Sequence, residues 1–405
     1  MAMSDLGAIL FVRYNRVLRA TFMGVVLVAC TLVYLRFEHT LNANTATLAE
    51  YMQEQADALD AILKNSTDAV NALHLHAETW YRLHPQAPAP SPLLLALQHC
   101  RVANAICLDT PPTPWRTSDI GNLTGFPGPL TEMRRRELEM ALSLNDCFRS
   151  ITSNLPEAAW VYYTSKQRFI NVFPWISSDK YFYADSLTQQ EFFREVSSSR
   201  NEGQPTAWTS AYIDEAGKGT MVTASSGVCV DGWFLGAVSL DLTLAGLNEF
   251  VRKWRAKSRT LFIINNHGQL LAHPSLVQPQ ALQVLPREAA FPPAIAADLP
   301  ASLLASRSRL VLVHGYYMET MGIRNAPFQL VLLVPLGEPI LASLETGVLT
   351  VLLLVLGLAV MLVAANRLAY RDAVLPAQKL VRYIQQESSA PGQTIPAVPA
   401  AWHWA

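Results

Sequence analysis

The chain has little net charge and a small charged fraction. It carries 31 Lys and Arg against 32 Asp and Glu, a net charge of -1, and only 16% of its residues are charged. Proteins that bind nucleic acid concentrate a basic surplus, so this balance excludes that class of partner. The low charge and the positive mean hydropathy instead indicate membrane spans beside a globular part.

Motifs of the common enzyme classes are also missing. The sequence contains no phosphate-binding loop, no Gly-x-Ser-x-Gly elbow and no His-Glu-x-x-His. His74 and His76 lie two apart in a helical pattern and therefore do not share a face, which argues against a metal site. We expect no cofactor, no metal and no catalytic activity in this fragment.

Cysteine is scarce, with five residues in the chain. Cys30 falls in an apolar stretch, and Cys100, Cys107, Cys147 and Cys229 follow it. Cys100 and Cys107 are close enough to close a small loop, and free buried thiols fit equally well, because pairing cannot be deduced from sequence.

Two apolar stretches stand at the ends of the chain. The stretch 346–366 meets the roughly 20 apolar residues that a spanning helix needs. The stretch 20–35 is shorter and spans only if Arg19 and Arg36 reach the two interfaces. A cleaved signal peptide is the alternative for the first stretch, but no small-x-small cleavage site follows Leu35 closely.

The flanking charges predict an orientation. Basic residues precede the first stretch and follow the second: Arg13, Arg16, Arg19, Arg367, Arg371, Lys379 and Arg382. The positive-inside rule then places both termini in the cytoplasm. We expect a two-pass membrane protein with its central part on the outer side of the membrane.

A long helix follows the first stretch. Residues 41–81 contain no Gly or Pro, and apolar residues recur at spacings of three, four or seven: Leu48, Met52, Leu59, Leu63, Val70 and Leu73. The stripe predicts either the seam of a homodimeric stalk or packing against the helix's own domain. We expect it to serve both.

The centre of the chain mixes helical and strand patterns after a proline-rich break at residues 85–92. Helices are predicted at 130–144 and 244–257, and strands at 160–163, 169–173, 219–225 and 233–240. A smaller unit follows, with strands at 261–264, 269–272, 310–314 and 328–334. Between them, the Ala- and Pro-rich residues 279–304 are predicted to be a poorly packed loop region.

A run of motif residues lies between 208 and 244. It comprises Trp208, then Tyr212-x-Asp214, then Met221-Val-Thr, then Gly236-x-Val-x-x-Asp241-Leu-Thr-Leu. This order resembles the outer module of double Cache (dCache) sensors, which are extracytoplasmic domains of bacterial receptors. The resemblance implies an α+β fold of two stacked PAS-like antiparallel-sheet modules on a long N-terminal stalk helix, flanked by two transmembrane helices.

The predicted domains follow from that layout. They are a cytoplasmic N-terminus (1–19), a first transmembrane helix (20–36), a stalk helix (37–82), a membrane-distal module (83–257), a membrane-proximal module (258–341), a second transmembrane helix (342–366) and a cytoplasmic linker (367–405).

The resemblance also implies a ligand site. Tyr212 and Asp214 match the family's Tyr-x-Asp, and Asp241 matches its later aspartate. In amine- and amino-acid-binding members, these two carboxylates receive the ligand ammonium. Independently, carboxylates among aromatic rings offer an amine charge-assisted hydrogen bonds and cation–π contacts. The candidate binding residues are Tyr162, Arg168, Trp175, Tyr183, Trp208, Tyr212, Asp214 and Asp241, with Trp160 and Tyr181 as further aromatic walls. The predicted partner is a small molecule, either an amine or an amino acid.

One departure concerns the ligand's other end. Amino-acid binders carry an Arg-x-Trp-Tyr segment that holds the ligand carboxylate, whereas here Arg168 and Trp175 stand seven residues apart. An amine without a carboxylate fits at least as well. Simpler interpretations remain open: Asp214 as a turn residue, Asp241 as the cap of the following helix, and the aromatic residues as ordinary core.

The C-terminal part has no output domain motif. Residues 375–384 resemble the start of the linker that follows the second span in such receptors. We therefore expect the sensory half of a sensor histidine kinase, with a diguanylate cyclase as the alternative. A membrane-anchored periplasmic enzyme is a third option, but no nucleophile–base pair supports it.

Overall fold

The computed structural model describes residues 3–100, 102, 104–197, 206–253, 259–276, 283–297 and 307–389. The chain divides into two compact units. One unit contains Met1–Thr47 and Gly337–Ala405, and the other contains Leu48–Leu336.

The first unit is helical. It contains the start of α1 (Met3–Leu83), then α8 (Gly337–Ala369), the single π-helical turn η4 (Tyr370–Val374) and α9 (Leu375–Ser389). Among the described residues, two helical segments are long and apolar enough to cross a membrane, Val12–Leu83 and Val351–Ala369. The predicted first span and the predicted stalk are therefore parts of one uninterrupted helix.

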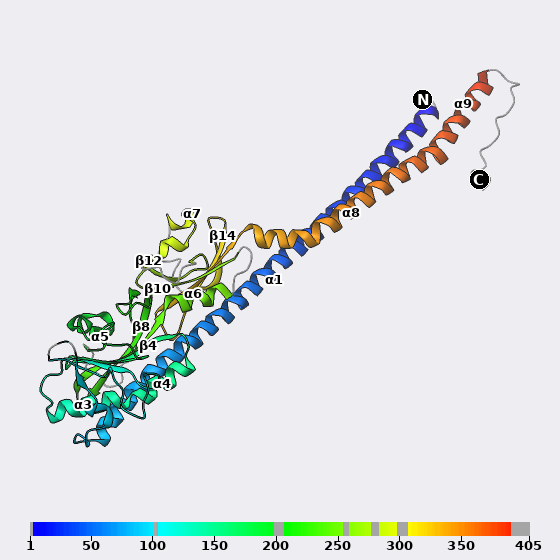
Figure 1. Ribbon diagram of the computed structural model, residues 1–405. Coiled ribbons are helices and arrows are strands. Elements are labelled where there is room, and N and C mark those ends of the chain that lie inside the picture. Colours follow the sequence, from blue (N-terminus) through cyan, green and yellow to red (C-terminus); the bar gives the residue numbers. More distant parts are fainter. Residues whose placement is uncertain are drawn as a thin grey trace. The chain divides into compact units, whose positions relative to one another are not determined.

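The second unit is α+β (Figure 1). Its first part comprises α2 (Pro92–Leu95), β1 (Gln98–His99), β2 (Ile106–Cys107), β3 (Asn122–Gly125), α3 (Glu132–Ser143), α4 (Asn145–Asn154), β4 (Ala158–Ser165), β5 (Phe169–Phe173), η1 (Asp185–Gln189), α5 (Glu191–Ser197), β6 (Ala207–Trp208), β7 (Tyr212–Ile213), β8 (Thr220–Val230), β9 (Trp233–Thr243) and α6 (Leu244–Lys253). Its second part comprises β10 (Thr260–Asn265), β11 (Gln269–Ala272), β12 (Leu285–Pro286), η2 (Arg287–Ala290), α7 (Pro293–Ala296), β13 (Arg307–Val313), β14 (Tyr316–Gly322) and β15 (Phe328–Pro335).

The strands form two antiparallel sheets. The first has the order β1-β2-β3-β5-β4-β9-β8-β6, with β7 also paired to β8. The second has the order β12-β11-β10-β15-β14-β13. Two antiparallel sheets joined to one long N-terminal helix confirm the predicted fold class.

The apolar stripe of α1 lies in the core of the second unit. Its six predicted members are at most 3% exposed, and they share one core cluster with Leu138 of α3, Phe148 of α4 and Leu240 of β9. The prediction that this stripe forms a dimer seam is wrong, because these side chains are already buried against their own chain. The same spacing serves either purpose, so the sequence alone did not distinguish them.

The region 279–304 was expected to be poorly packed, and its described part is not. Ala290 of η2, Ile295 of α7 and Phe291 between these two elements are buried. The ring of Phe291 meets the ring of Phe262 at a centroid distance of 5.0 Å. Residues 279–282 and 298–304 lie outside the described part of the chain. The strand β14 was missed, because its polar Glu319 and Thr320 interrupt the apolar pattern.

The two sheets are joined within this unit by the short strand β6 and the segment after it. Trp208 Nε1 donates to the carbonyl oxygen of Asn325 at 3.0 Å, and its ring lies 5.3 Å from that of Phe328. The backbone of Ala211 exchanges two hydrogen bonds with the side-chain amide of Gln269. The segment that ends at Asp214 is therefore attached to the second sheet at two points.

Candidate functional site

One face of the first sheet forms the floor of a cavity of about 110 Å³. Side chains alternate between the two faces of a strand, so Trp160 and Tyr162 of β4 share this face with Asp241 of β9. The register places Trp160 and Thr223 directly beside Asp241 on its two neighbouring strands. The lining residues are Trp160, Tyr162, Ile170, Val172, Tyr181, Leu187, Gln190, Phe192, Tyr212, Ile213, Asp214, Glu215, Ala216 and Asp241.

Asp241 is the buried acid of this floor, with only 3% of its surface exposed. Its Oδ1 accepts hydrogen bonds from Tyr162 Oη at 3.1 Å and from Thr223 Oγ1 at 2.7 Å. The Thr223 hydroxyl has thereby used its proton, so Tyr212 Oη must be the donor in its 2.8 Å contact with Thr223.

Burial dominates the protonation of Asp241. Loss of hydration raises its pKa to about 7, and the nearby charge of Asp214 adds to the rise, against the hydrogen bonds from Thr223 and Tyr162. The group therefore exchanges its proton near neutral pH, facing a cavity that is large enough for a small molecule.

Asp214 forms the rim of the cavity and also shapes the turn after β7. Its side chain accepts from the backbone N–H groups of Ala216 at 3.0 Å and Lys218 at 2.8 Å. Its Oδ2 also accepts from Trp160 Nε1 at 3.1 Å. The interpretation of Asp214 as a turn residue is therefore correct, and the turn is what holds its carboxylate at the cavity.

Lys218 is a cation close to the carboxylates of Asp214 and Asp241. Its ammonium lies 3.4 Å from the centroid of the Trp160 ring and donates to the carbonyl oxygen of Ala159. Burial lowers the pKa of Lys218, while the carboxylates of Asp214 and Asp241 oppose that change. Lys218 is not among the residues that line the cavity; of the described lining residues, three are carboxylates and none is basic.

The cavity is covered by elements that follow β5 in the chain. Tyr181 comes from the connection to η1, Leu187 and Gln190 from η1 and its end, and Phe192 from α5. The ring of Phe192 meets that of Tyr162 at a centroid distance of 5.5 Å, edge to face. The site is thus a chamber between the sheet and this covering layer.

The structure brings together four of the eight predicted binding residues: Tyr162, Tyr212, Asp214 and Asp241. Trp160 and Tyr181, predicted as aromatic walls, also line the cavity. The interpretation of Asp241 as a helix cap is wrong, because the residue lies inside β9, two residues before the strand ends. Gln190 and Glu215 were missed; Glu215 directly follows the Tyr-x-Asp motif, whereas Gln190 has no signal of its own.

Arg168 does not line the cavity. It is the third residue of the three-residue turn between β4 and β5 and has a φ of 66°, a conformation typical of such a turn. There its guanidinium pairs with Asp185 through two hydrogen bonds of 2.9 Å, and both side chains are exposed. The turn carries Arg168 to the surface, so the structure does not bring it to the cavity with the other predicted residues.

Trp175, Tyr183 and Trp208 lie outside the cavity lining as well. Trp175 Nε1 donates to the carbonyl oxygen of Leu108. Tyr183 is a buried member of the aromatic cluster on this face, and Trp208 faces the second sheet. Some of the predicted aromatic residues therefore line the cavity, whereas others pack in the core around it. Residue type alone does not distinguish these two roles.

Cys100 and Cys107 form a disulfide, so the first of the two alternatives for this pair is correct. Cys30, Cys147 and Cys229 do not take part in a disulfide. Within the described residues, no group of His, Cys, Asp and Glu side chains has the arrangement of a metal site.

No protein-family model and no curated protein matches the chain. Solved structures with a similar fold include the ligand-binding domain of the Pseudomonas fluorescens chemoreceptor CtaA in complex with L-alanine. That match has 15% identity and a TM-score of 0.44, and covers 72% of this chain and 96% of the other. The ligand-binding domain of the Pseudomonas aeruginosa PAO1 amino acid chemoreceptor PctC in complex with GABA has 13% identity and a TM-score of 0.41, with coverage of 72% and 99%.

The extracellular domain of the putative histidine kinase mmHK1S-Z2 has 14% identity and a TM-score of 0.37, and covers 48% of this chain and 81% of the other. Because these identities and TM-scores are low, the ligands of these proteins are not assigned to this chain. The resemblance to double Cache sensors is carried by the motif residues of this chain and by its two antiparallel sheets on one long helix.

Proposed function

We propose that the chain is a sensor that binds a small cationic molecule in the chamber over the first sheet. The observation that carries the proposal is the lining itself: Asp214, Glu215 and the buried Asp241 stand among aromatic rings, with no basic side chain among the described lining residues. An ammonium group entering the chamber would replace the missing positive charge.

An amine is favoured over an amino acid. A zwitterion brings a carboxylate that needs a cation, and the one arginine predicted for that role is paired with Asp185 at the surface. Trp160, Tyr162 and Tyr212 supply faces for a cation–π contact. The cavity of about 110 Å³ admits a small ligand rather than a peptide.

Signalling would use the covalent continuity of the chain. The second unit continues through α1 on one side and from β15 into α8 on the other, and both helices contain candidate membrane spans. With both termini in the cytoplasm, as the flanking charges favour, the chamber lies on the outer side of the inner membrane. The output would be that of a sensor histidine kinase or a diguanylate cyclase.

A homodimer of this receptor would need a surface other than the apolar stripe of α1. The opposite face of that helix is exposed and carries Ala61, Ala72 and Leu75 between charged residues. Such a face is typical of a weak contact that depends on its tethering in the membrane.

The test is a thermal-shift screen of the full chain in detergent against amines, amino acids and small carboxylates. A ligand at 100 times its dissociation constant should stabilise the protein by about 2.7 kcal/mol. We expect amines to raise the melting temperature, and we expect Asp241→Asn and Asp214→Asn to abolish this increase. Asp185→Asn is the matched control, because that carboxylate is exposed and does not line the cavity.

An amine shift that survives both substitutions would place the ligand elsewhere. A shift with carboxylates alone would overturn the cationic ligand.

A further inference from the structure

The covering layer of the chamber includes a segment without helix or strand, residues 174–183, here called the lid segment. It connects β5 to η1 and carries Tyr181, which lines the cavity. An irregular segment has few backbone partners of its own, so its position depends on what holds it from outside.

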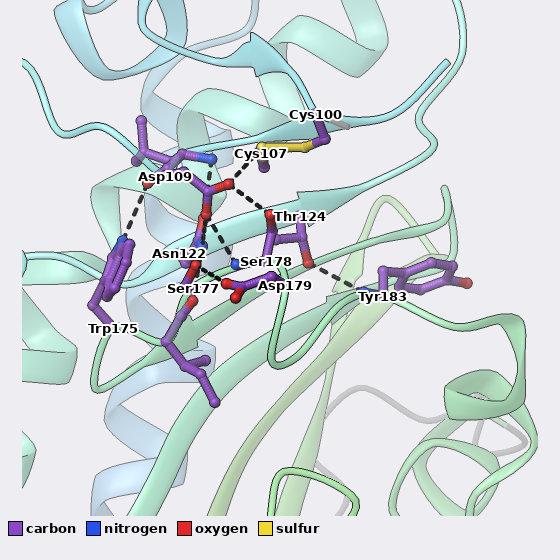
Figure 2. The surroundings of a disulfide bond; sticks show 12 residues. Cys100, Cys107, Asp109, Asn122, Thr124, Trp175, Ser177, Ser178, Asp179 and Tyr183 are labelled. Atoms are coloured by element: carbon purple, nitrogen blue, oxygen red, sulfur yellow. Dashed lines mark hydrogen bonds between the residues drawn. A yellow bond between two sulfur atoms is a disulfide. The ribbon is translucent and has the colours of Figure 1, made fainter. Parts of the chain in front are cut away.

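Four hydrogen-bonded attachments hold the lid segment against β3 and the residues that follow β2 (Figure 2). Trp175 donates to Leu108, the carbonyl of Ile176 accepts from Asn122 at 2.8 Å, Ser178 binds Asp109, and the N–H of Tyr183 donates to Thr124 at 3.2 Å. Two of the predicted ligand residues, Trp175 and Tyr183, thus belong to this attachment.

Asp109 holds the middle of the segment. Its Oδ1 accepts from the N–H of Ser178 at 2.9 Å, and its Oδ2 accepts from Ser178 Oγ at 2.6 Å. Its Oδ1 also accepts from Asn122 Nδ2 at 2.8 Å. Asn122 is fully buried, and its Oδ1 accepts from the N–H of Leu108 at 2.9 Å. This bond fixes the orientation of the Asn122 amide whose Nδ2 donates to Asp109.

The disulfide lies directly beside this carboxylate. Cys107 Sγ is 3.2 Å from Asp109 Oδ2, but a disulfide sulfur has no proton to donate, so the contact is not a hydrogen bond. Asp109 is therefore satisfied by three donors, two of which come from the lid segment. Hydrogen bonds to a charged group are stronger than those between neutral groups.

We propose that Asp109 is a positioning residue for the chamber: by holding Ser178 it keeps the lid segment docked and Tyr181 over the cavity. The proposal deepens the proposed function and rests on it for the ligand, but the docking itself is independent of any ligand. Asp109 touches no cavity atom and acts through Ser178 and Tyr181.

The experiment measures amide hydrogen exchange and hydroxyl-radical footprinting by mass spectrometry on the full chain in detergent without ligand. Asp109→Ala should speed exchange of residues 178–183 by about tenfold or more, because the lost bonds to a charged group exceed the 1.4 kcal/mol that corresponds to tenfold. Oxidation of Tyr162, buried at the floor, should rise several-fold.

Two further variants separate positioning from general stability. Asp109→Asn keeps one acceptor for the Ser178 N–H, and its amide can donate to Ser178 Oγ, so exchange should return most of the way to that of the unchanged protein. Asp119→Ala is the matched control: this carboxylate lies in the same β2–β3 connection and binds the N–H of Arg116, not the lid segment.

Unchanged exchange of residues 178–183 in Asp109→Ala would overturn the proposal, as would an equal rise in Asp119→Ala. If Asp109→Ala does not fold, Ser178→Ala removes one donor and should still raise exchange there, with no change in the sheet; no rise would again contradict the proposal. None of these readouts uses an amine, so failure of the cationic ligand would leave them unaffected.

Discussion

At the scale of single residues, strand register decides what each carboxylate does. Asp241 and Asp214 belong to one motif, yet Asp241 is buried in a strand among hydroxyl donors, whereas Asp214 is held by the N–H groups of its own turn. Burial raises the pKa of Asp241 to about 7. The motif predicted both acids, and the burial of Asp241 came from the tertiary structure.

The pH dependence of ligand binding follows from Asp241. A cation favours the ionised carboxylate, so its binding must displace a proton below pH 7. For an amine that stabilises the protein in the thermal-shift screen, the affinity should rise from pH 5.5 to 8. The rise should be up to tenfold per pH unit below the pKa of Asp241. Titration calorimetry across this range checks it; a flat profile would contradict a role for Asp241.

Protein stability without ligand should change in the opposite direction. Because the folded-state pKa of Asp241 lies above its ordinary value near 4, the folded state holds the proton more tightly, and stability is lost as pH rises from about 4 to about 7. Asp241→Asn should remove part of this loss. The rest of the pH-dependent loss of stability should remain, because burial also raises the pKa of Glu137 to about 7.

At the scale of elements, the close pairing of β4 with β9 depends on packing contacts that hydrophobic periodicity does not predict. Tyr163 Oη donates to the buried Glu137 of α3 at 2.8 Å, beside Gly236 of β9. A Cβ at Gly236 would lie 2.3 Å from the carbonyl oxygen of Thr164 and 2.7 Å from Tyr163 Oη. Periodicity predicted both strands, but the need for a glycine there arises from their pairing.

Gly236→Ala should therefore destabilise the protein by about 2 kcal/mol or more, since the clash involves backbone and cannot be relieved by a side-chain rotation. Gly246→Ala is the matched control, because its Cβ would come no closer than 3.5 Å to Thr243 Oγ1. In helix α6 that change should be neutral or stabilising by up to about 1 kcal/mol. Chemical denaturation of both variants measures the difference; equal stabilities would refute the steric argument.

At the scale of the whole second unit, one carboxylate joins α1 to the second sheet. Asp60 accepts from the N–H groups of Arg324 and Asn325 and from Asn325 Nδ2. Burial tends to raise its pKa, but the hydrogen bonds from Asn325 and the charge of Arg324 hold the pKa below the usual range. The carbonyl of Asn325 in turn accepts from Trp208, so α1, the second sheet and the segment leading to the chamber meet at one turn.

Asp60→Ala should weaken this junction by about 2 kcal/mol, because it leaves four donors of Arg324 and Asn325 without their acceptor. Calorimetry should then show the unfolding transition of Asp60→Ala broaden or split relative to that of the unchanged protein, as the two sheets lose their common attachment to α1. Asp57→Ala is the control, since Asp57 pairs with the same Arg324 but at an exposed position. A single sharp transition in Asp60→Ala would show that other contacts join the sheets.

The sequence by itself determined the apolar ends, the long helix, most strands and the motif acids Asp214 and Asp241, because periodicity, turn chemistry and motif order are local properties. Tertiary structure decided which aromatic residues line the chamber, that Arg168 pairs outside it, and that the stripe of α1 packs on its own chain. These outcomes depend on strand register and on which groups the fold places within contact distance of each side chain. Residue type and spacing do not specify either.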